Sequence, residues 1–229
     1  MSHQKSGEWY RLMAAAATRH LLMKSLGTTL FIGVFFVAYF YLLKNPAYPT
    51  SIMPFTWVDR MIPFQPLALP LYFSLWLYVS LPLGLLSTRR EMYGYGLAMA
   101  TTCLVGLVFF YFWPTVVPAA NIDWARYPNV IFLKDLDASG NACPSLHVTT
   151  AIFSGICLHQ VLRRFGTPTW LLIFNILWCA GIIYSTLATR QHVAVDVLAG
   201  LALGSLAAYL SLRLGILSGA GNHPSAPPT

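Results

Sequence analysis

Six long apolar runs, separated by segments that carry nearly all of the charge, constrain this chain more than any other feature. They cover about residues 25–43, 66–86, 93–113, 144–161, 168–187 and 192–212. Each run approaches the ~20 apolar residues that a helix needs to cross a bilayer. With 57% hydrophobic and 9% charged residues, the 229-residue chain has too little polar surface for an ordinary soluble domain. We therefore predict an all-α polytopic membrane protein with six transmembrane helices.

The segments outside these runs predict two flanking regions. Residues 1–24 combine basic residues with Trp9, Leu12 and Met13 at helical spacing, which predicts an N-terminal amphipathic helix on the membrane surface. A basic start before an apolar run also fits a signal peptide. However, the run at 25–43 is long enough to span a bilayer, and no small-residue cleavage site follows it. We expect a six-helix catalytic domain at 25–212 and a disordered, proline-rich tail at 213–229.

The positive charges predict an orientation in the membrane. The formal charge of +7 is scattered between apolar runs, which membrane topology explains better than nucleic-acid binding. With six spans both termini lie on one side, and that side collects most of the Lys and Arg residues. The positive-inside rule makes that side cytoplasmic. The long loop at 115–143 then faces the periplasm or exterior of an inner or plasma membrane.

His192 and Asp196 are the first candidates for chemistry. They are four residues apart, hence on one face of the last helix, where a carboxylate can fix the tautomer of an imidazole. Asp196 is the only acid in any of the apolar runs. Ionisable groups inside membrane helices are costly and are usually functional. The alternative is a structural hydrogen-bonded pair that joins helices.

A second polar stretch, Asn141-Ala-Cys-Pro-Ser-Leu-His147, precedes the fourth run. His147 lies at a predicted helix start, where free backbone amides and the helix dipole favour an anion. Ser145 adds a hydroxyl to the same turn. Taken alone, such residues are often capping or packing residues. Both histidines, however, are predicted to lie at the same membrane face.

Two histidines beside a helix N-terminus, with Arg190 nearby, suit phosphoryl transfer. One imidazole attacks phosphorus, the other protonates the leaving alcohol, and cations or amides hold the phosphate oxygens. This scheme requires no metal and no cofactor. A lipid phosphate in the membrane is the expected partner, and the oligomeric state is left open.

The two stretches resemble motifs of the type 2 phosphatidic acid phosphatase (PAP2) superfamily. Cys-Pro-Ser-Leu-His at 143–147 is similar to its Pro-Ser-x-His motif, and His192-Val-Ala-Val-Asp196 is similar to its His-x-x-x-Asp motif. The resemblance implies a lipid phosphatase in which His192 forms a phosphohistidine. It further implies that Asp196 orients His192, that His147 is the general acid and that Ser145 donates to the phosphate.

The sequence departs from the family pattern in its cations. The arginine expected six residues before the histidine is replaced by Thr186, and the family's Lys/Arg-Pro motif has no match. Arg190, Lys134 and Arg126 are the available substitutes for binding phosphate. The Thr-Arg-Gln-His pattern looks more like the branch that includes inositol phosphorylceramide synthases. Transfer of a phosphate-bearing headgroup between lipids is therefore the alternative to hydrolysis.

Two other function classes fit the composition. A transporter or non-catalytic lipid-binding protein would use the buried His and Asp as relay or structural groups, although no internal repeat is detectable. A serine hydrolase would use Ser145, but no Gly-x-Ser-x-Gly motif surrounds it.

Overall fold

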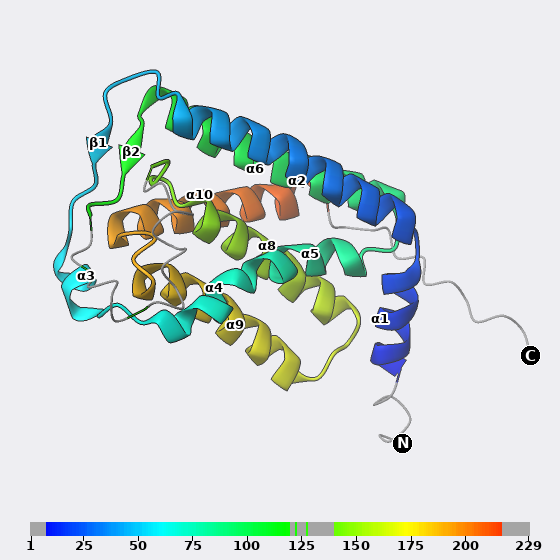
Figure 1. Ribbon diagram of the computed structural model, residues 1–229. Coiled ribbons are helices and arrows are strands. Elements are labelled where there is room, and N and C mark those ends of the chain that lie inside the picture. The colour runs from blue at the N-terminus through cyan, green and yellow to red at the C-terminus, as the bar shows by residue number, and fades with distance from the viewer. Residues whose placement is uncertain (1–7, 120–121, 123–126, 128–139, 217–229) are drawn as a thin grey trace, which may run out of the picture.

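The computed structural model describes residues 8–119, 122, 127 and 140–216, most of which lie in a bundle of helices (Figure 1). The elements in chain order are α1 (Glu8–Thr18), α2 (Leu21–Lys44), β1 (Ser51–Ile52), α3 (Trp57–Met61), the 3₁₀-helix η1 (Pro66–Ala68), α4 (Leu69–Phe73), α5 (Leu75–Leu85), α6 (Arg89–Phe112), β2 (Thr115–Val116), α8 (Leu146–Arg164), α9 (Thr169–Ala188) and α10 (Ala194–Arg213). Strands β1 and β2 pair in parallel and connect the loops that follow α2 and α6. The predicted helical class is confirmed.

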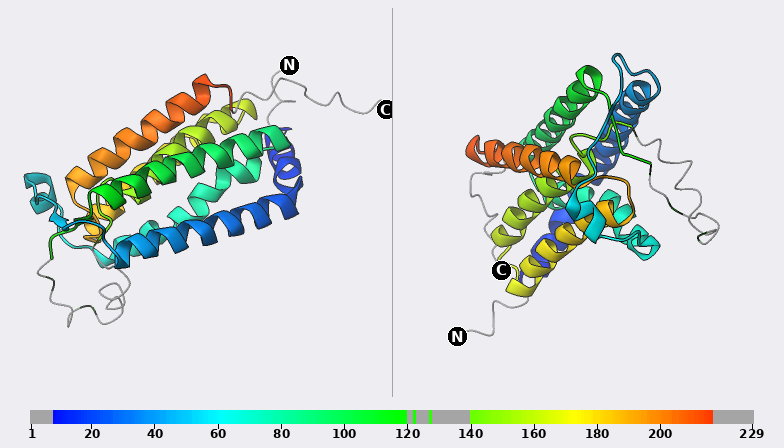
Figure 2. Two further views of the ribbon diagram at one scale, coloured as in Figure 1. Left: turned by 90° about the horizontal axis from the view of Figure 1, so that it is seen from above. Right: turned by 90° about the vertical axis from the view of Figure 1, so that its left-hand side faces the viewer.

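Helix α8 lies in the middle of the bundle, where it packs against α5, α6, α9 and α10 (Figure 1 and Figure 2). Val148, Ala151, Phe153 and Cys157 of this helix are fully buried. Polar side chains of α8 are buried as well, and the hydroxyl of Ser154 hydrogen-bonds to that of Tyr95 on α6 at 3.0 Å. Helices α5, α6, α9 and α10 therefore surround α8, whereas α2 packs on the outside against α6 and α5.

Five segments in the described part of the chain are long and apolar enough to cross a membrane: Leu21–Lys44, Pro66–Leu85, Arg89–Phe112, Thr169–Ala188 and Ala194–Arg213. They fit an integral membrane protein. The remaining predicted span corresponds to α8, whose hydropathy is lowered by polar residues such as Thr149, Ser154 and His159. Because neighbouring helices surround α8, much of its surface faces protein rather than lipid. The six-span arrangement stays a prediction.

The second predicted span is not one continuous helix. It is divided into η1, α4 and α5, with the break at Ser74. The Ser74 hydroxyl donates to the Leu71 carbonyl at 2.6 Å and accepts from the indole of Trp178 on α9 at 2.8 Å. Helix α9 thus holds the break in place. The carbonyl of Tyr72, two residues before the break, contacts the His147 side chain of α8.

The flanking segments are only partly tested. A helix, α1, occupies Glu8–Thr18 within the predicted N-terminal segment, and Lys24 Nζ donates to the Ala16 carbonyl at its end (2.7 Å). The predicted position of this helix on a membrane surface stays a prediction. Most of the predicted tail, residues 217–229, lies outside the described residues.

The two ends of the bundle differ in charge. Arg89 begins α6, while Arg164 and Arg213 end α8 and α10, so these charges gather at one end. There Arg164 Nη1 donates to Glu91 Oε1 at 2.9 Å. The opposite end, called the loop end below, contains β1, β2, α3 and the first turns of α8 and α10 (Figure 1). Which end is cytoplasmic stays a prediction.

Helices α8 and α10 approach closely at Gly200 and Gly204, two small residues four positions apart on α10. A Cβ atom built on Gly200 would lie 2.6 Å from the Ser145 carbonyl oxygen, and one on Gly204 would meet the Thr149 carbonyl oxygen. Neither backbone oxygen can move aside without displacing α8. The two helices are therefore in contact through their main chains.

Replacing Gly200 by alanine should separate these helices. Overpacking of this kind typically costs about 1–3 kcal/mol, so Gly200→Ala is expected to lower the free energy of unfolding in detergent, measured by circular dichroism during SDS titration. Gly33→Ala is the matched control because a Cβ there has no atom within 4 Å. The control should gain ~0.5–1 kcal/mol from helix propensity. Equal effects of the two changes would contradict the close contact.

Candidate active site

His192 and Asp196 form the buried centre of the candidate site. His192 Nδ1 lies 3.5 Å from Asp196 Oδ2, and the two side chains are 13% and 0% exposed. Asp196 Oδ2 also accepts the backbone N–H of Val193 at 3.0 Å. Within the described residues, His192 Nδ1 and Asp196 Oδ1 have no hydrogen-bond partner. A small shift would bring Nδ1 into a full hydrogen bond with the carboxylate.

A tight turn places His192 at the start of α10. The backbone N–H groups of Gln191 and His192 both donate to the Thr186 carbonyl, at 3.1 and 3.2 Å. Arg190 takes a left-handed backbone conformation, with φ of 60°, which lets the chain reverse after α9. Because Nδ1 faces Asp196, Nε2 is the ring nitrogen that remains for a substrate.

His147, in the first turn of α8, stacks on Tyr72 of α4. The ring centroids are 4.1 Å apart and the ring planes differ by 14°. Its Nε2 lies 3.2 Å from the Tyr72 carbonyl oxygen. A carbonyl only accepts, so Nε2 carries the hydrogen of this bond. Nδ1 is then the nitrogen left for proton transfer.

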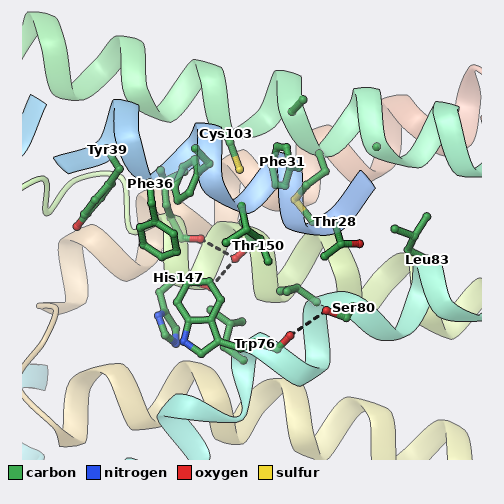
Figure 3. Close-up of a pocket in the computed structure, with 18 of the residues that line it drawn as sticks. Thr28, Phe31, Phe36, Tyr39, Trp76, Ser80, Leu83, Cys103, His147 and Thr150 are labelled. Carbon is green, nitrogen blue, oxygen red and sulfur yellow. Dashed lines mark hydrogen bonds between the residues drawn. The ribbon is translucent and has the colours of Figure 1, made fainter. Parts of the chain in front are cut away.

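Both histidines line one cavity of about 870 Å³. The cavity extends between α2, α5, α6 and α8, and Figure 3 shows side chains of these four helices pointing into the same space, with His147 beside Trp76 and Thr150. Gln191 also lines the cavity, which sequence reasoning did not predict. The structure therefore brings the two predicted histidines from separate helices to a shared space.

Ser145 lies beside this cavity but is not among its lining residues. It is fully buried as the N-cap of α8, and its Oγ accepts from the Val148 N–H at 3.2 Å. Its own N–H donates to the Asp196 carbonyl at 3.1 Å. Ser145 thus joins the start of α8 to the first turn of α10. The predicted donation to phosphate stays a prediction.

The predicted cations are only partly placed. Arg190 Nη1 donates to the Asp59 carbonyl at 2.8 Å, and its guanidinium lies 5.1 Å from the centroid of the Phe55 ring. It reaches back toward α3 and is not among the cavity-lining residues. Lys134 and Arg126 lie outside the described residues.

Asp59 is a site-forming residue that the sequence reasoning missed. It is 1% exposed, and its Oδ1 accepts the N–H of Ala194, the first residue of α10, at 2.8 Å. Its Oδ2 accepts from the Thr56 N–H and hydroxyl at 2.7 and 2.6 Å. The Thr-x-x-Asp spacing resembles a capping box, which indicates the short helix α3. Its partner on α10, Ala194, lies 135 residues further along the chain, so the spacing gives no sign of this contact.

Cys143 also lies at the loop end, in surroundings that do not favour a nucleophile. Its N–H donates to the Thr115 hydroxyl at 2.8 Å, which ties it to β2. Burial and the nearby Asp196 raise the pKa of the Cys143 thiol to about 11. The thiol is therefore neutral near pH 7, and the thiolate is the reactive form.

Comparison with known proteins gives one match. The family model described as the PAP2 superfamily matches residues 90–216, which is more than half of the 229-residue chain. This chain belongs to the PAP2 superfamily. No curated protein sequence and no solved structure matches it.

PAP2 membership indicates phosphatase or phosphotransferase activity. The matched PAP2 region covers α6, α8, α9 and α10, with His147, His192 and Asp196 among its residues. Helix α2 and Asp59 precede it. The chemistry-bearing histidines are thus in the PAP2 region, whereas one wall of the cavity and the contact that holds α10 come from outside it.

Removing the Asp59 carboxylate should destabilise the loop end. Asp59→Ala leaves the buried Ala194 N–H and the Thr56 groups without acceptors, and an unsatisfied buried group costs ~1–3 kcal/mol. We expect a lower thermal unfolding temperature in detergent, and faster hydrogen exchange at residues 190–196. Asp59→Asn keeps one carbonyl oxygen as an acceptor, so its unfolding temperature should fall less than that of Asp59→Ala. If both variants matched the wild type, Asp59 would have no such role.

Proposed function

We propose that this protein is an integral membrane lipid phosphate phosphatase that acts through a phosphohistidine on His192. The observation that carries the proposal is that His147 and His192 line one apolar cavity. Each lies at the start of a helix in the PAP2 region, α8 for His147 and α10 for His192. The buried carboxylate of Asp196 behind His192 supports it, because it can stabilise an imidazole that gains positive charge.

In the first step, His192 Nε2 attacks phosphorus while the bond from phosphorus to the leaving oxygen breaks. Asp196 stabilises the positive charge on the ring through Nδ1–H. His147 acts in its doubly protonated form, which the negative charge of the bound phosphate favours: it donates the proton of Nδ1 to the leaving alkoxide and becomes neutral, while Nε2–H stays on the Tyr72 carbonyl. In the second step, water attacks phosphorus, its proton returns to His147, and the bond from phosphorus to Nε2 breaks.

The phosphate charge needs cations, and Arg190 is the proposed source in the described part of the chain. A guanidinium has five N–H donors, and the contact with Asp59 uses one nitrogen. The remaining donors leave capacity for phosphate oxygens if the side chain turns toward the cavity. Lys134 and Arg126 are proposed to add charge, and the first-turn amides of α8 to add donors.

The second candidate function is transfer of a phosphate-bearing headgroup to another lipid. Thr186 in place of the usual arginine, with Arg190 four residues on, favours it, since this pattern resembles inositol phosphorylceramide synthases. An alcohol acceptor would replace water in the second step. In both cases we propose a site facing the periplasm or exterior, because the opposite end carries most of the described basic residues.

His192→Ala should abolish turnover without unfolding the protein. The expected loss of phosphate release from a panel of lipid phosphates in detergent micelles is at least about a thousandfold. His159→Ala is the matched control, since His159 is a histidine on α8 that does not line the site cavity. Wild-type activity of His192→Ala on every lipid phosphate that the native protein hydrolyses would refute the mechanism.

Acceptor dependence separates hydrolysis from transfer. The phosphatase predicts release of free phosphate at the same rate with and without added lipid alcohols. A transferase predicts little free phosphate and a new lipid product that depends on the alcohol. In both cases, rapid quenching without acid should trap a phosphorylated histidine in the wild type and none in His192→Ala. Repeated failure to trap it with an active substrate would favour a binding role.

A further inference from the structure

The cavity continues far beyond the two histidines along one face of α2. Its lining residues on α2 come in adjacent pairs spaced four residues apart, from Met23 and Lys24 to Tyr39 and Phe40. This spacing places them on one face of the helix. Asn141 Nδ2 donates to the Tyr39 carbonyl at 3.1 Å, so the Tyr39 end of this face lies beside the stretch that leads into His147.

The length of this lined face exceeds one membrane leaflet. From Phe40 to Lys24 the helix rises about 24 Å, whereas half of the hydrocarbon core of a bilayer is about 15 Å. At the far end, Lys24 Nζ donates to the Ala16 carbonyl and to the Gly84 carbonyl, both at 2.7 Å. These bonds fasten α1 and α5 to α2 there.

The walls of the cavity are suited to hydrocarbon. Phe31 and Phe35 of α2 and Cys103 of α6 line it, and the ring of Phe36 contacts that of Trp76 on α5, with centroids 5.3 Å apart. Figure 3 shows several of these side chains pointing inward. Polar side chains along the α2 face are few, with Thr28 in its middle. A chain of methylene groups would meet mostly apolar side chains along this length of the cavity.

Two glycines leave room in the half of the cavity that is further from the histidines, toward Lys24. Gly27 on α2 and Gly96 on α6 both line it, and a Cβ built on either has no atom within 4 Å. Gly27 lies twelve residues, about 18 Å, from Tyr39. Gly96 lies fourteen residues, about 21 Å, from Phe110, whose ring contacts Tyr39. The two glycines are therefore at similar depths.

We propose that this cavity holds the hydrocarbon chain of the substrate lipid and that Gly27 and Gly96 set the chain length it accepts. The proposal rests on the proposed function, because it places the phosphate at His192 and the chain along α2. A chain that fills the cavity passes the glycines and extends beyond the length of one leaflet. Larger side chains at these positions would block its distal part.

The test compares chain-length profiles of Gly27→Leu and Gly96→Leu with the wild type. Leucine favours helix more than glycine does, so neither change should unfold its helix. Gly33→Leu is the matched control: Gly33 is also on α2 and has open space around a Cβ, but it does not line the cavity. The substrates are n-alkyl phosphates and prenyl phosphates from about eight to about twenty carbons, a range around the leaflet length.

We expect Gly27→Leu and Gly96→Leu to lower kcat/KM for the longest chains by at least about tenfold, while the shortest substrates and the Gly33→Leu profile stay unchanged. If the variants shift the preferred chain length downward only among the n-alkyl phosphates, the natural chain is alkyl; if they do so only among the prenyl phosphates, it is prenyl. Identical profiles for all four proteins would overturn the proposal, as would an equal loss at every chain length.

Affinity measurements distinguish failure of the chain site from failure of the phosphatase function. The affinity of the same phosphates for the His192→Ala protein is measured by competition with a radiolabelled long-chain phosphate. If the wild type hydrolyses none of them but long chains bind tightly and Gly27→Leu weakens only these, the chain site stands and the phosphatase fails. If hydrolysis occurs but binding is independent of chain length in every variant, the chain site fails and the phosphatase stands.

Discussion

Helices α8 and α10 touch through their main chains at Gly200 and Gly204, and the geometry of the site depends on this contact. Thr149 Oγ1 reinforces it by donating to the Ser145 carbonyl at 2.8 Å and the Gly200 carbonyl at 3.2 Å. At the loop end, the Ser145 N–H reaches the Asp196 carbonyl. The first turns of both helices are thereby fixed together, so the histidine near the start of each can line one cavity.

The start of α10 is held by two buried carboxylates. Asp196 Oδ2 accepts the Val193 N–H, and Asp59 Oδ1 accepts the Ala194 N–H. A helix N-terminus carries partial positive charge, which stabilises both acids at little cost. Asp196 still has one oxygen without a partner in the described part of the chain. In the proposed mechanism, the His192 imidazole gains positive charge 3.5 Å from Asp196 Oδ2, so this buried carboxylate is placed to stabilise it.

The PAP2 region and the segment before it contribute different parts of the site. The histidines, Ser145 and Asp196 all belong to residues 90–216, where the family model matches. Asp59 and the cavity-lining face of α2 lie before residue 90. The cavity wall on α2 and the Asp59 contact are therefore contributed by a part of the chain that the family model does not match. Of the two glycines proposed to set substrate length, Gly27 lies outside the matched region and Gly96 lies inside it.

Hydropathy alone located the helices to within a few residues, because a segment in lipid must satisfy its backbone internally and present apolar side chains. The order of His147, His192 and Asp196 in two short motifs likewise indicated the family. Hydropathy also located α8, but this helix is not among the five described segments apolar enough to span a membrane, since a helix enclosed by protein need not be as apolar as one facing lipid. The break at Ser74 depends on Trp178, and the role of Asp59 depends on Ala194. Those contacts join residues far apart in the chain, so only the tertiary structure, which brings them within hydrogen-bonding distance, decided them.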